Sequence, residues 1–520
     1  MNINMKKVFL PLIVCAAMSM SVNAVESGKA NIYASGLKVT DTGVQFVLNT
    51  TPTEVKVNFY NGSELVKSIL VENGKKGIND VLLESVFDVE VNTSLTWEVV
   101  ATAEPTTFVD ILSDPRVPEQ QFYTPNDVVV DNDPSSANFG RVYITNGEAA
   151  ATNNRTSNLG VYILDATLSD VTGQGESAYT GGVNWITNFS SPYRLALDEE
   201  GNLFVGDWSD DNSGIWIMDT KNPSANFKQV FGGARNDDGM SSESGVNIHG
   251  SIIAMCVIGK GEERTLYTYD EDYTDGSDKV LPLLGYKIGN LETAWASAPT
   301  WSYANGSQNA SFNKVISNVK YVGDMCSDKR GGFWVSQYRG SLADTHPGLA
   351  HFNSKGEIDY ITNMFVDGNQ NYAFAINEKG DKIVYTSSQK VNVGNITYDE
   401  LGVPEITLDE ERTEEFSTLY GSDLGNRMSG VAFDVADNVY ITSYSYSFLG
   451  VYSLPKAENT YTTPANVTLV VKDEMTGIAD VAVDANAPVE YYNLQGVKVE
   501  NPANGIFVKK QAGKATKVIL

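Results

Sequence analysis

A three-part unit recurs along the middle of the chain and limits its fold more than any other feature. In residues 194–219 it consists of a mostly apolar run, the turn Asp198-Glu199-Glu200-Gly201-Asn202, a second apolar run, and a third run that begins at Gly214. The same order returns in residues 430–454 and 128–165. Short apolar runs separated by acidic and Gly-Asn turns are typical of antiparallel strands. The unit therefore predicts a chain built from small repeated sheets.

Weaker copies of the unit occur at residues 252–269, 325–335 and 374–385. Successive turns are about 49 to 70 residues apart, and the six units fill about 350 residues, a period typical of propeller blades with long loops. We expect an all-β fold with a β-propeller in residues 117–464. About six blades fit best, and five or seven also fit. A parallel β-helix would show shorter, more regular periods, and tandem sandwiches would not keep one three-strand unit.

The unit resembles the repeats of NHL and SMP-30/gluconolactonase propellers. Their units read as an apolar strand, D-x-x-G-N, a second apolar strand and G-I-x-x-x-D. Residues 195–219 and 431–454 match this pattern well, and the other copies are degraded. The matching residues form turns and fill the space between blades, so the resemblance implies a fold and leaves the function open.

Residues 25–104 read as a separate β-sandwich. Apolar residues alternate in Val44–Leu48 and Val55–Tyr60, and the turn dipeptides Asn61-Gly62 and Asn73-Gly74 follow. In pattern, although without a diagnostic motif, this region resembles small immunoglobulin-like modules of bacterial surface and flagellar-hook-capping proteins.

Residues 1–24 read as a secretory signal peptide. Lys6 and Lys7 precede the apolar run Val8–Val22, and cleavage is expected after Ala24. A lipoprotein attached through Cys15 is the alternative, but Leu12-Ile13-Val14 matches its motif poorly. The run is too short for a comfortable transmembrane span, and no other stretch is apolar enough to be one. We expect a secreted protein or one held at the outer membrane or cell surface.

Residues 465–520 read as a small C-terminal β-module. Tyr492-Asn493-Leu494-Gln495-Gly496 and Gly505-Ile506-Phe507-Val508 resemble the C-terminal modules of exported Bacteroidetes proteins, several of which are sorting signals. From Lys498 to Leu520 the segment carries five lysines and one glutamate, whereas the whole chain has a formal charge of -28. The resemblance implies a sorting signal, and a plain module that closes the C-terminus is the alternative.

Composition excludes some partners and leaves the cysteines open. With 65 acidic and 37 basic residues, the chain lacks the basic footprint of a protein that binds nucleic acid or an anionic membrane. After removal of the signal, Cys256 and Cys326 remain. They either pair or are two buried thiols.

No catalytic motif emerges from the sequence, so position in the propeller guides the search for a site. The three histidines, His249, His346 and His351, show no zinc spacing. Residues just before the inner strands should form a ring at the channel mouth, where a sugar or an anion could bind. The candidate ligand-binding residues are Asn126, Tyr193, Arg194, His249, Asp324, Tyr372 and Arg427. Alternatively, these groups satisfy one another and a file of water.

Two metal sites are conceivable from the pattern. SMP-30-like lactonases hold a divalent ion with a Glu, an Asn and an Asp, and Asn126, Asp324 and Asn371 imitate part of that set without the Glu. Separately, Asp207, Asp210 and Asn212 alternate in a loop as Ca²⁺ ligands do, but the loop lacks the Gly and Glu of an EF-hand, and a solvated acidic turn is the preferred explanation. We expect no required cofactor, with Ca²⁺ as the candidate ion.

Three functions remain after this reading. The first is a secreted or surface binding protein that recognises a glycan or a protein. Aromatic residues in two loops support it: Tyr444, Tyr446 and Phe448 in one, and Trp295 and Trp301 in the other. Packing in the core and between blades is the alternative explanation of all these aromatic residues. The second is a metal-dependent, lactonase-like hydrolase or lyase. The third is a structural or adhesive component. For the first, replacing Arg194 or Arg427 by alanine is expected to weaken binding without unfolding the propeller.

Overall fold

The computed structural model confirms the all-β prediction. It describes residues 29–83, 87, 89–114, 116–152, 155–171, 178–185, 191–208, 214–220, 226–232, 252–270, 283–289, 291, 301–303, 322–337, 348–362, 371–387, 390–420, 428–445, 447–472, 488–494, 496–511 and 514–520. Within these residues, one α-helix, α1 (Glu410–Tyr420), and two short 3-10 helices, η1 (Pro118–Gln120) and η3 (Gly261–Glu263), accompany the strands. Among these residues, no helix is long and apolar enough to cross a membrane.

In the described part of the chain, six antiparallel sheets form a closed ring. The sheets are, in chain order, β8 (Pro125–Val130), β9 (Val142–Asn146) and β12 (Gly160–Leu164); β13 (Arg194–Leu197), β14 (Leu203–Asp207), β15 (Gly214–Met218) and β16 (Lys228–Gly232); β17 (Ile252–Ile258), β18 (Thr265–Asp270), β19 (Leu283–Lys287) and β20 (Trp301–Tyr303); β21 (Val322–Ser327), β22 (Phe333–Gln337), β23 (Leu349–Phe352) and β24 (Ile358–Thr362); β25 (Asn371–Ile376), β26 (Lys382–Ser387), β27 (Lys390–Tyr398) and β28 (Pro404–Leu408); and β29 (Met428–Phe433), β30 (Asn438–Ser443), β31 (Phe448–Ser453) and β7 (Asp110–Ile111). The inner strands β8, β13, β17, β21, β25 and β29 contact one another in this order, and β29 contacts β8. This is the arrangement of a β-propeller.

The ring closes through the last sheet. Its outer strand, β7, comes from the segment before the first sheet, and Ile111 is paired with Tyr452 of β31. A strand from one end of the propeller thus completes the sheet at the other end. A small hairpin, β10 (Ala150–Ala151) with β11 (Thr156–Ser157), projects between β9 and β12.

The acidic turns of the repeat are built as the sequence predicts. Asp198 Oδ1 accepts hydrogen bonds from the backbone N–H groups of Glu200 and Asn202, and Asn202 Nδ2 donates to Asp198 Oδ2. Asp434 and Asn438 repeat the same three bonds in the last sheet, with Ala436 in place of Glu200. Each aspartate therefore holds its own turn, which explains why the motif recurs at the end of an inner strand.

The sandwich has two sheets, and the expected boundaries of this region are wrong at its C-terminal end. One sheet contains β1 (Ala34–Val39), β2 (Gly43–Leu48) and β5 (Gly77–Leu82), and the other contains β4 (Glu64–Leu70), β3 (Glu54–Asn61), β6 (Ser94–Thr102) and β32 (Thr460–Pro464), with β33 (Leu469–Val470) also paired to β6. β6 needs a partner on its second edge, and Leu469 and Val471 complete the core around Phe59 and Trp97. The propeller is therefore inserted within the sandwich, between β6 and β32.

Buried asparagines join the sandwich to one face of the propeller. The backbone N–H of Asn31 donates to Asn438 Oδ1 at 2.9 Å, and Asn438 Nδ2 donates to the Asn31 carbonyl at 2.8 Å. Asn459 Nδ2 donates to the Ala30 carbonyl at 3.0 Å, and Asn49 Nδ2 donates to that of Asn31 at 2.8 Å. These asparagines are all buried. The reciprocal bonds fix the orientation of the two units.

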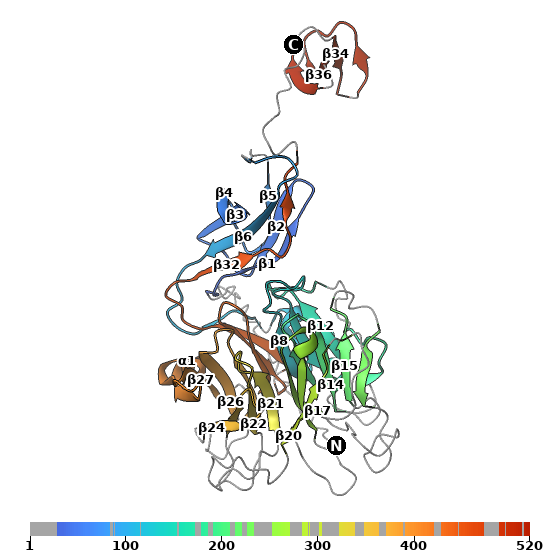
Figure 1. Ribbon diagram of the computed structural model, residues 1–520. Coiled ribbons are helices and arrows are strands. Elements are labelled where there is room, and N and C mark those ends of the chain that lie inside the picture. The colour runs from blue at the N-terminus through green and yellow to red at the C-terminus, as the bar shows by residue number, and fades with distance from the viewer. Residues whose placement is uncertain are drawn as a thin grey trace, which may run out of the picture.

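We call the face that meets the sandwich the proximal face; it carries the turns that follow the inner strands, including those at Asp131 and Asp434. The opposite, distal face is where the inner strands begin. In Figure 1 the sandwich lies above the proximal face.

The C-terminal residues form a sheet of their own. The sheet contains β35 (Lys498–Val499), β34 (Val489–Tyr492), β36 (Ile506–Gln511) and β37 (Lys514–Ile519). No residue of 488–520 whose exposure is described is buried.

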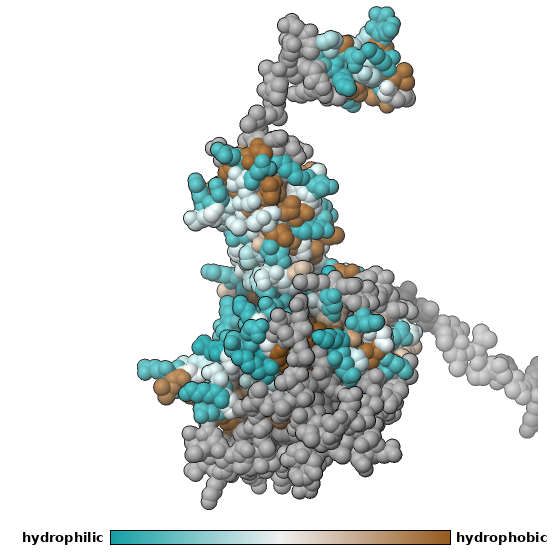
Figure 2. Space-filling model, turned by 45° about the vertical axis from the view of Figure 1, so that its right-hand side comes forward, coloured by the Kyte–Doolittle hydropathy of each residue, from teal (hydrophilic) through white to brown (hydrophobic). Residues whose placement is uncertain are grey.

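The sandwich has an apolar surface. Brown surface is visible on it in Figure 2, and Leu65, Leu70, Ile78 and Leu82 are all exposed.

Candidate functional site

The structure brings part of the predicted ring together in the channel. Asn126, Tyr193, Arg194 and Asp324 lie at the beginnings of inner strands, and all four are buried. Of the other predicted residues, His249, Arg427, Asp210 and Asn212 lie outside the described residues, as does the side chain of Tyr372.

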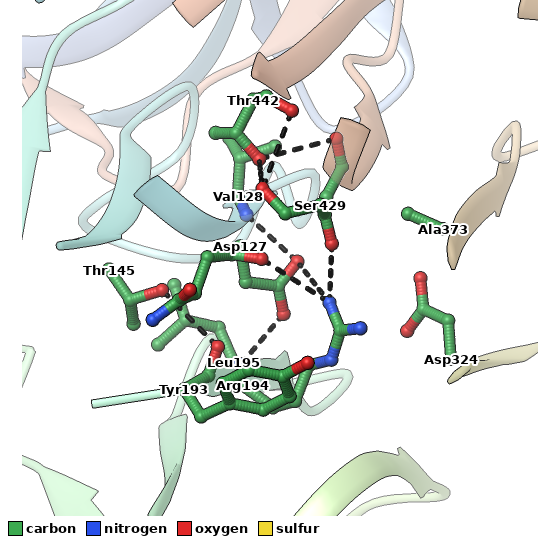
Figure 3. Close-up of polar contacts among 12 residues, drawn as sticks. Asp127, Val128, Thr145, Tyr193, Arg194, Leu195, Asp324, Ala373, Ser429 and Thr442 are labelled. Carbon is green, nitrogen blue, oxygen red and sulfur yellow. Dashed lines mark hydrogen bonds and ion pairs between the residues drawn. The ribbon is translucent and has the colours of Figure 1, made fainter. Parts of the chain in front are cut away.

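Arg194 lies at the centre of this group and bonds to neighbouring inner strands (Figure 3). Its Nε donates to the carbonyl of Ile253 at 2.7 Å, Nη1 to that of Ser429 at 2.6 Å, and Nη2 to that of Gly323 at 2.5 Å. A longer bond of 3.4 Å joins Nη1 to the carbonyl of Asn126. One side chain of β13 thus connects to β8, β17, β21 and β29.

Two aspartates beside Arg194 bridge neighbouring sheets. Asp127 Oδ2 accepts from the backbone N–H of Leu195 at 2.9 Å, and its Oδ1 lies 3.7 Å from Arg194 Nη1. Asp324 Oδ2 accepts from the backbone N–H of Phe374 at 3.2 Å. Burial raises the pKa of both carboxyl groups, although the Arg194 charge opposes this shift. Each aspartate ties its own inner strand to the next one in the ring.

The sequence analysis missed Asp127, and a signal for it existed. Asp127, Arg194 and Asp324 each stand four positions before the aspartate that begins the following turn, at 131, 198 and 328. Charged residues at one register of otherwise apolar inner strands indicate a shared layer in the channel. Gly430 holds the same register in β29, and a Cβ there would lie 2.7 Å from the Cα of Asp127.

Asn126 and Tyr193 complete the layer. Asn126 Nδ2 donates to the Pro192 carbonyl at 3.1 Å, and the Arg194 guanidinium carbon lies 4.9 Å from the centre of the Tyr193 ring. The Tyr193 ring also lies 5.7 Å from that of Trp208. The geometry of this layer fits the alternative in which the ring residues satisfy one another. Arg194→Ala would then loosen several strands, contrary to the expectation that it only weakens binding.

A cavity of about 150 Å³ lies between this layer and the proximal face. All six inner strands line it, from Asp127 and Asp324 to Asn132, Lys329 and Glu378. At the proximal end Lys329 Nζ donates to Glu378 Oε1 at 2.7 Å. Cys256 and Cys326 also line the cavity as separate thiols, and burial raises the pKa of both. Their thiols therefore stay protonated at neutral pH.

Of the predicted calcium ligands, the structure describes Asp207. It is buried at the end of β14, and Ser191 Oγ donates to its Oδ1 at 3.1 Å. Within the described ranges, no three His, Cys, Asp or Glu residues are grouped as metal ligands. The calcium site stays a prediction.

His351 is held by two carboxylates in the fourth sheet. Its Nδ1 lies 2.5 Å from Asp359 Oδ1, and its Nε2 lies 3.0 Å from Asp328 Oδ2. Burial alone would lower the pKa of His351, but the hydrogen bonds to Asp328 and Asp359 raise it above the ordinary value. The ring is buried and lies 4.7 Å from that of Trp334. The two carboxylates therefore favour the protonated form of His351, which joins Asp328 to Asp359.

Comparisons with known proteins give a weak likeness. No family model and no curated protein matches the chain. A structural-genomics protein of unknown function from Bacteroides thetaiotaomicron is 11% identical, with a TM-score of 0.39 over 81% of this chain and 98% of its own. Hydrazine synthase from Kuenenia stuttgartiensis is 13% identical, with a TM-score of 0.39 over 65% and 96%. A chain of the mitotic checkpoint complex is 11% identical, with a TM-score of 0.33 over 78% and 96%. Likeness at this level supports no inference about family or function.

Proposed function

We propose that this is an exported binding protein, whose propeller presents its distal face to a glycan or a protein partner. The observation that carries the proposal is the asparagine junction, in which Asn31, Asn438 and Asn459 hold the sandwich against the proximal face. Because the sandwich is fixed to the proximal face, the distal face is the surface that the propeller can present to a partner in a fixed orientation.

The contacts in the channel favour binding over catalysis. Arg194, Asp127 and Asp324 are buried and bonded to the backbone of neighbouring strands, so their geometry serves the ring. A reaction at this layer would need at least one of these groups to face a substrate. The lactonase-like alternative therefore has less support than the binding protein.

Export and surface delivery belong to the same proposal. The signal-like residues 1–24 and the lysine-bearing C-terminal sheet suit a protein that is carried across the inner membrane and then held at the cell surface or released. The sorting role of residues 488–520 is supported by their separate sheet, which pairs with no strand of the sandwich or propeller in the described part.

A binding screen tests the proposal. The mature chain, residues 25–520, is applied to a glycan array and to purified surface proteins, with Tyr444→Ala as the variant of the distal face. Tyr444 Oη bonds to Glu148 at 3.4 Å on that face. Tyr60→Ala is the matched control, because Tyr60 lies on the sandwich and bonds to Glu98.

Loss of binding in Tyr444→Ala with binding kept in Tyr60→Ala supports the proposal. Binding that depends on Tyr60 and ignores Tyr444 would assign the partner to the sandwich instead. A rise in Tm with Ca²⁺ that EDTA reverses, without binding to any partner, would favour the metal-dependent alternative.

A further inference from the structure

The cavity in the channel can be reached from the proximal face. Asp127 and Asp324 line its inner end and are 4% and 7% exposed. Further along the same wall Cys326 is half-buried, and the side chains of Lys329 and Glu378 at the proximal end are 35% and 36% exposed. Exposure therefore rises from the two carboxylates to the rim, as it does in a pocket that is open at one end.

Unpaired strand edges give the cavity a polar wall. In the described part of the chain, each inner strand pairs with one neighbour in its own sheet, so its second edge faces the channel. Such an edge carries free N–H and C=O groups. Arg194 already donates to the carbonyls of Ile253, Ser429 and Gly323 on these edges. The channel thus holds one buried cation by means of acceptors that a second cationic donor could also use.

The layer at Arg194 holds one positive charge for two negative ones. Figure 3 shows the guanidinium between the side chains of Asp127 and Asp324. The cation that lines the cavity elsewhere, Lys329, already donates to Glu378 at 2.7 Å. Burial raises the pKa of both aspartates, as expected for carboxylates with too little counter-charge. A second cation beside them would correct the imbalance.

Both carboxylates can accept more hydrogen bonds than they receive from the backbone. Asp127 accepts from the N–H of the residue that follows it and from that of Leu195 on the next strand. Asp324 likewise accepts from its own successor and from Phe374. An ionised carboxylate offers about four lone-pair sites. The bonds that fasten the ring therefore leave sites for donors in the cavity.

The size of the cavity and the kinds of acceptor favour an organic ammonium over a metal ion. Its volume is about 150 Å³, and an engineered cavity of about that volume in another protein binds benzene, so a chain of about four carbons with one ammonium group fits. Among the described residues, no three His, Cys, Asp or Glu are grouped to hold a metal. An ammonium has three donors, which carboxylates and strand carbonyls can accept, and Met325, Phe374 and Val431 line the cavity beside an alkyl chain.

We propose that the channel cavity binds a small primary alkylammonium ion. Its ammonium group binds to Asp127 and Asp324, and its alkyl chain extends toward the rim at Lys329 and Glu378. The site opens on the proximal face, whereas the proposed function assigns the partner to the distal face. The inference is therefore independent of the proposed function.

Thermal unfolding of the mature chain, residues 25–520, tests the site with n-butylammonium chloride, which replaces NaCl at constant ionic strength. A pH of 8.5 favours ionised carboxyl groups and keeps the alkylamine protonated. At about tenfold excess over Kd, the midpoint should rise by about 2 °C. n-Butanol has the same chain without the charge, and tetraethylammonium has the charge without N–H donors. Neither should give a saturable rise.

The alkylammonium can be a free amine or the lysine side chain of another molecule. Nα-acetyl-lysine amide, titrated in the same way, distinguishes these sources. A rise with butylammonium alone assigns the site to a free amine. A rise with both compounds shows that the cavity also admits a lysine side chain.

Asp324→Asn is the variant that tests the carboxylates. Asparagine keeps the size of the side chain and an oxygen that can accept from Phe374, but it removes the charge. The apparent Kd for butylammonium should rise at least tenfold. Asp114→Asn is the matched control, because Asp114 pairs with exposed Arg116, and it should leave the response unchanged. No saturable response in the wild type, an equal response to n-butanol or tetraethylammonium, or an equal Kd in Asp324→Asn would overturn the proposal.

A measurement on the wild-type protein covers the case in which Asp324→Asn unfolds. In protein labelled with ¹³C at the methionine methyl groups, the resonance of Met325 should shift on addition of butylammonium, because Met325 lines the cavity. Met218, buried in the second sheet and outside the cavity lining, should keep its resonance. Met325→Leu assigns the signal. An unmoved Met325 resonance at the highest concentration would refute the site.

Discussion

Arg194→Met is the substitution that most directly tests the account of the channel. Methionine keeps much of the side-chain volume but removes the charge and every donor. The carbonyls of Ile253, Ser429 and Gly323 lose donors at 2.5–2.7 Å, and Asp127 loses the positive charge 3.7 Å away. Removing one partner of a buried ion pair costs about 3–5 kcal/mol. The orphaned carbonyls add to this loss, and relaxation recovers part of it, so we expect a net loss of about 3–5 kcal/mol.

This loss converts into a measurable change in Tm. The propeller spans residues 110–453. With an unfolding entropy of about 2.1 cal/mol/K per residue, a loss of 3–5 kcal/mol lowers Tm by about 4–7 °C. Differential scanning calorimetry of the mature chain gives the midpoint. Adding Asp127→Asn should restore part of the loss, because it removes the carboxylate that Arg194→Met leaves without its counter-charge.

The control is Arg116→Met, which removes an exposed ion pair with Asp114. Exposed pairs contribute about 0–1 kcal/mol, so its Tm should stay within about 1 °C of wild type. If Arg194→Met behaved like this control, the interpretation of Arg194 as a fastening of the ring would be refuted. If it kept its Tm and lost a ligand, the original prediction of a binding residue would be correct.

Three further perturbations follow from the described contacts. The pKa of His351 is higher in the folded protein than in the unfolded chain, so the protonated side chain stabilises the fold fully below the unfolded pKa of about 6.5, and this contribution is lost as pH rises through the folded pKa. In a calorimetric pH series Tm should therefore fall above pH 6.5, and the fall should be smaller in His351→Gln. Gly430→Ala places a Cβ 2.7 Å from the Asp127 Cα and 2.8 Å from the Val128 nitrogen, so it should cost about 1–3 kcal/mol and lower Tm by about 1–4 °C; an unchanged midpoint would mean that β8 and β29 are not held at this distance. Removing residues 488–520 should leave the Tm of the main transition within about 1 °C, because none of them with described exposure is buried; a larger fall in a scan of the truncated chain would reveal a stabilising contact.

Local chemistry made the ring predictable from the sequence, whereas long-range pairing hid the extent of the sandwich. Asp198 and Asp434 accept hydrogen bonds from residues of their own turns, so a short stretch of sequence contains the whole motif. The pairing of β32 with β6 joins Thr460 to Thr102 across the whole propeller, and no local pattern marks it. Residues 460–464 were therefore assigned to the propeller, although they complete the other unit.

The candidate site was predicted as a set of positions but not as a set of contacts. Arg194 was found because it precedes an apolar run, yet its partners are backbone carbonyls, which every residue carries and no sequence pattern distinguishes. Arg155 had even less signal, because its neighbours Phe122 and Tyr162 come from separate segments. The two arginines carry the same donors, and only the fold shows which acceptors each of them meets.

Three arginines are buried in the described part of the chain, and they differ in the acceptors that they meet. Arg194 meets backbone carbonyls of its own ring, and Arg264 meets the carboxylates of Asp198 and Glu200, so each is accounted for by the fold. The guanidinium carbon of Arg155 lies 4.7 Å from the centre of the Phe122 ring and 4.6 Å from that of Tyr162, and its Nε and Nη2 meet no acceptor in the described part of the chain.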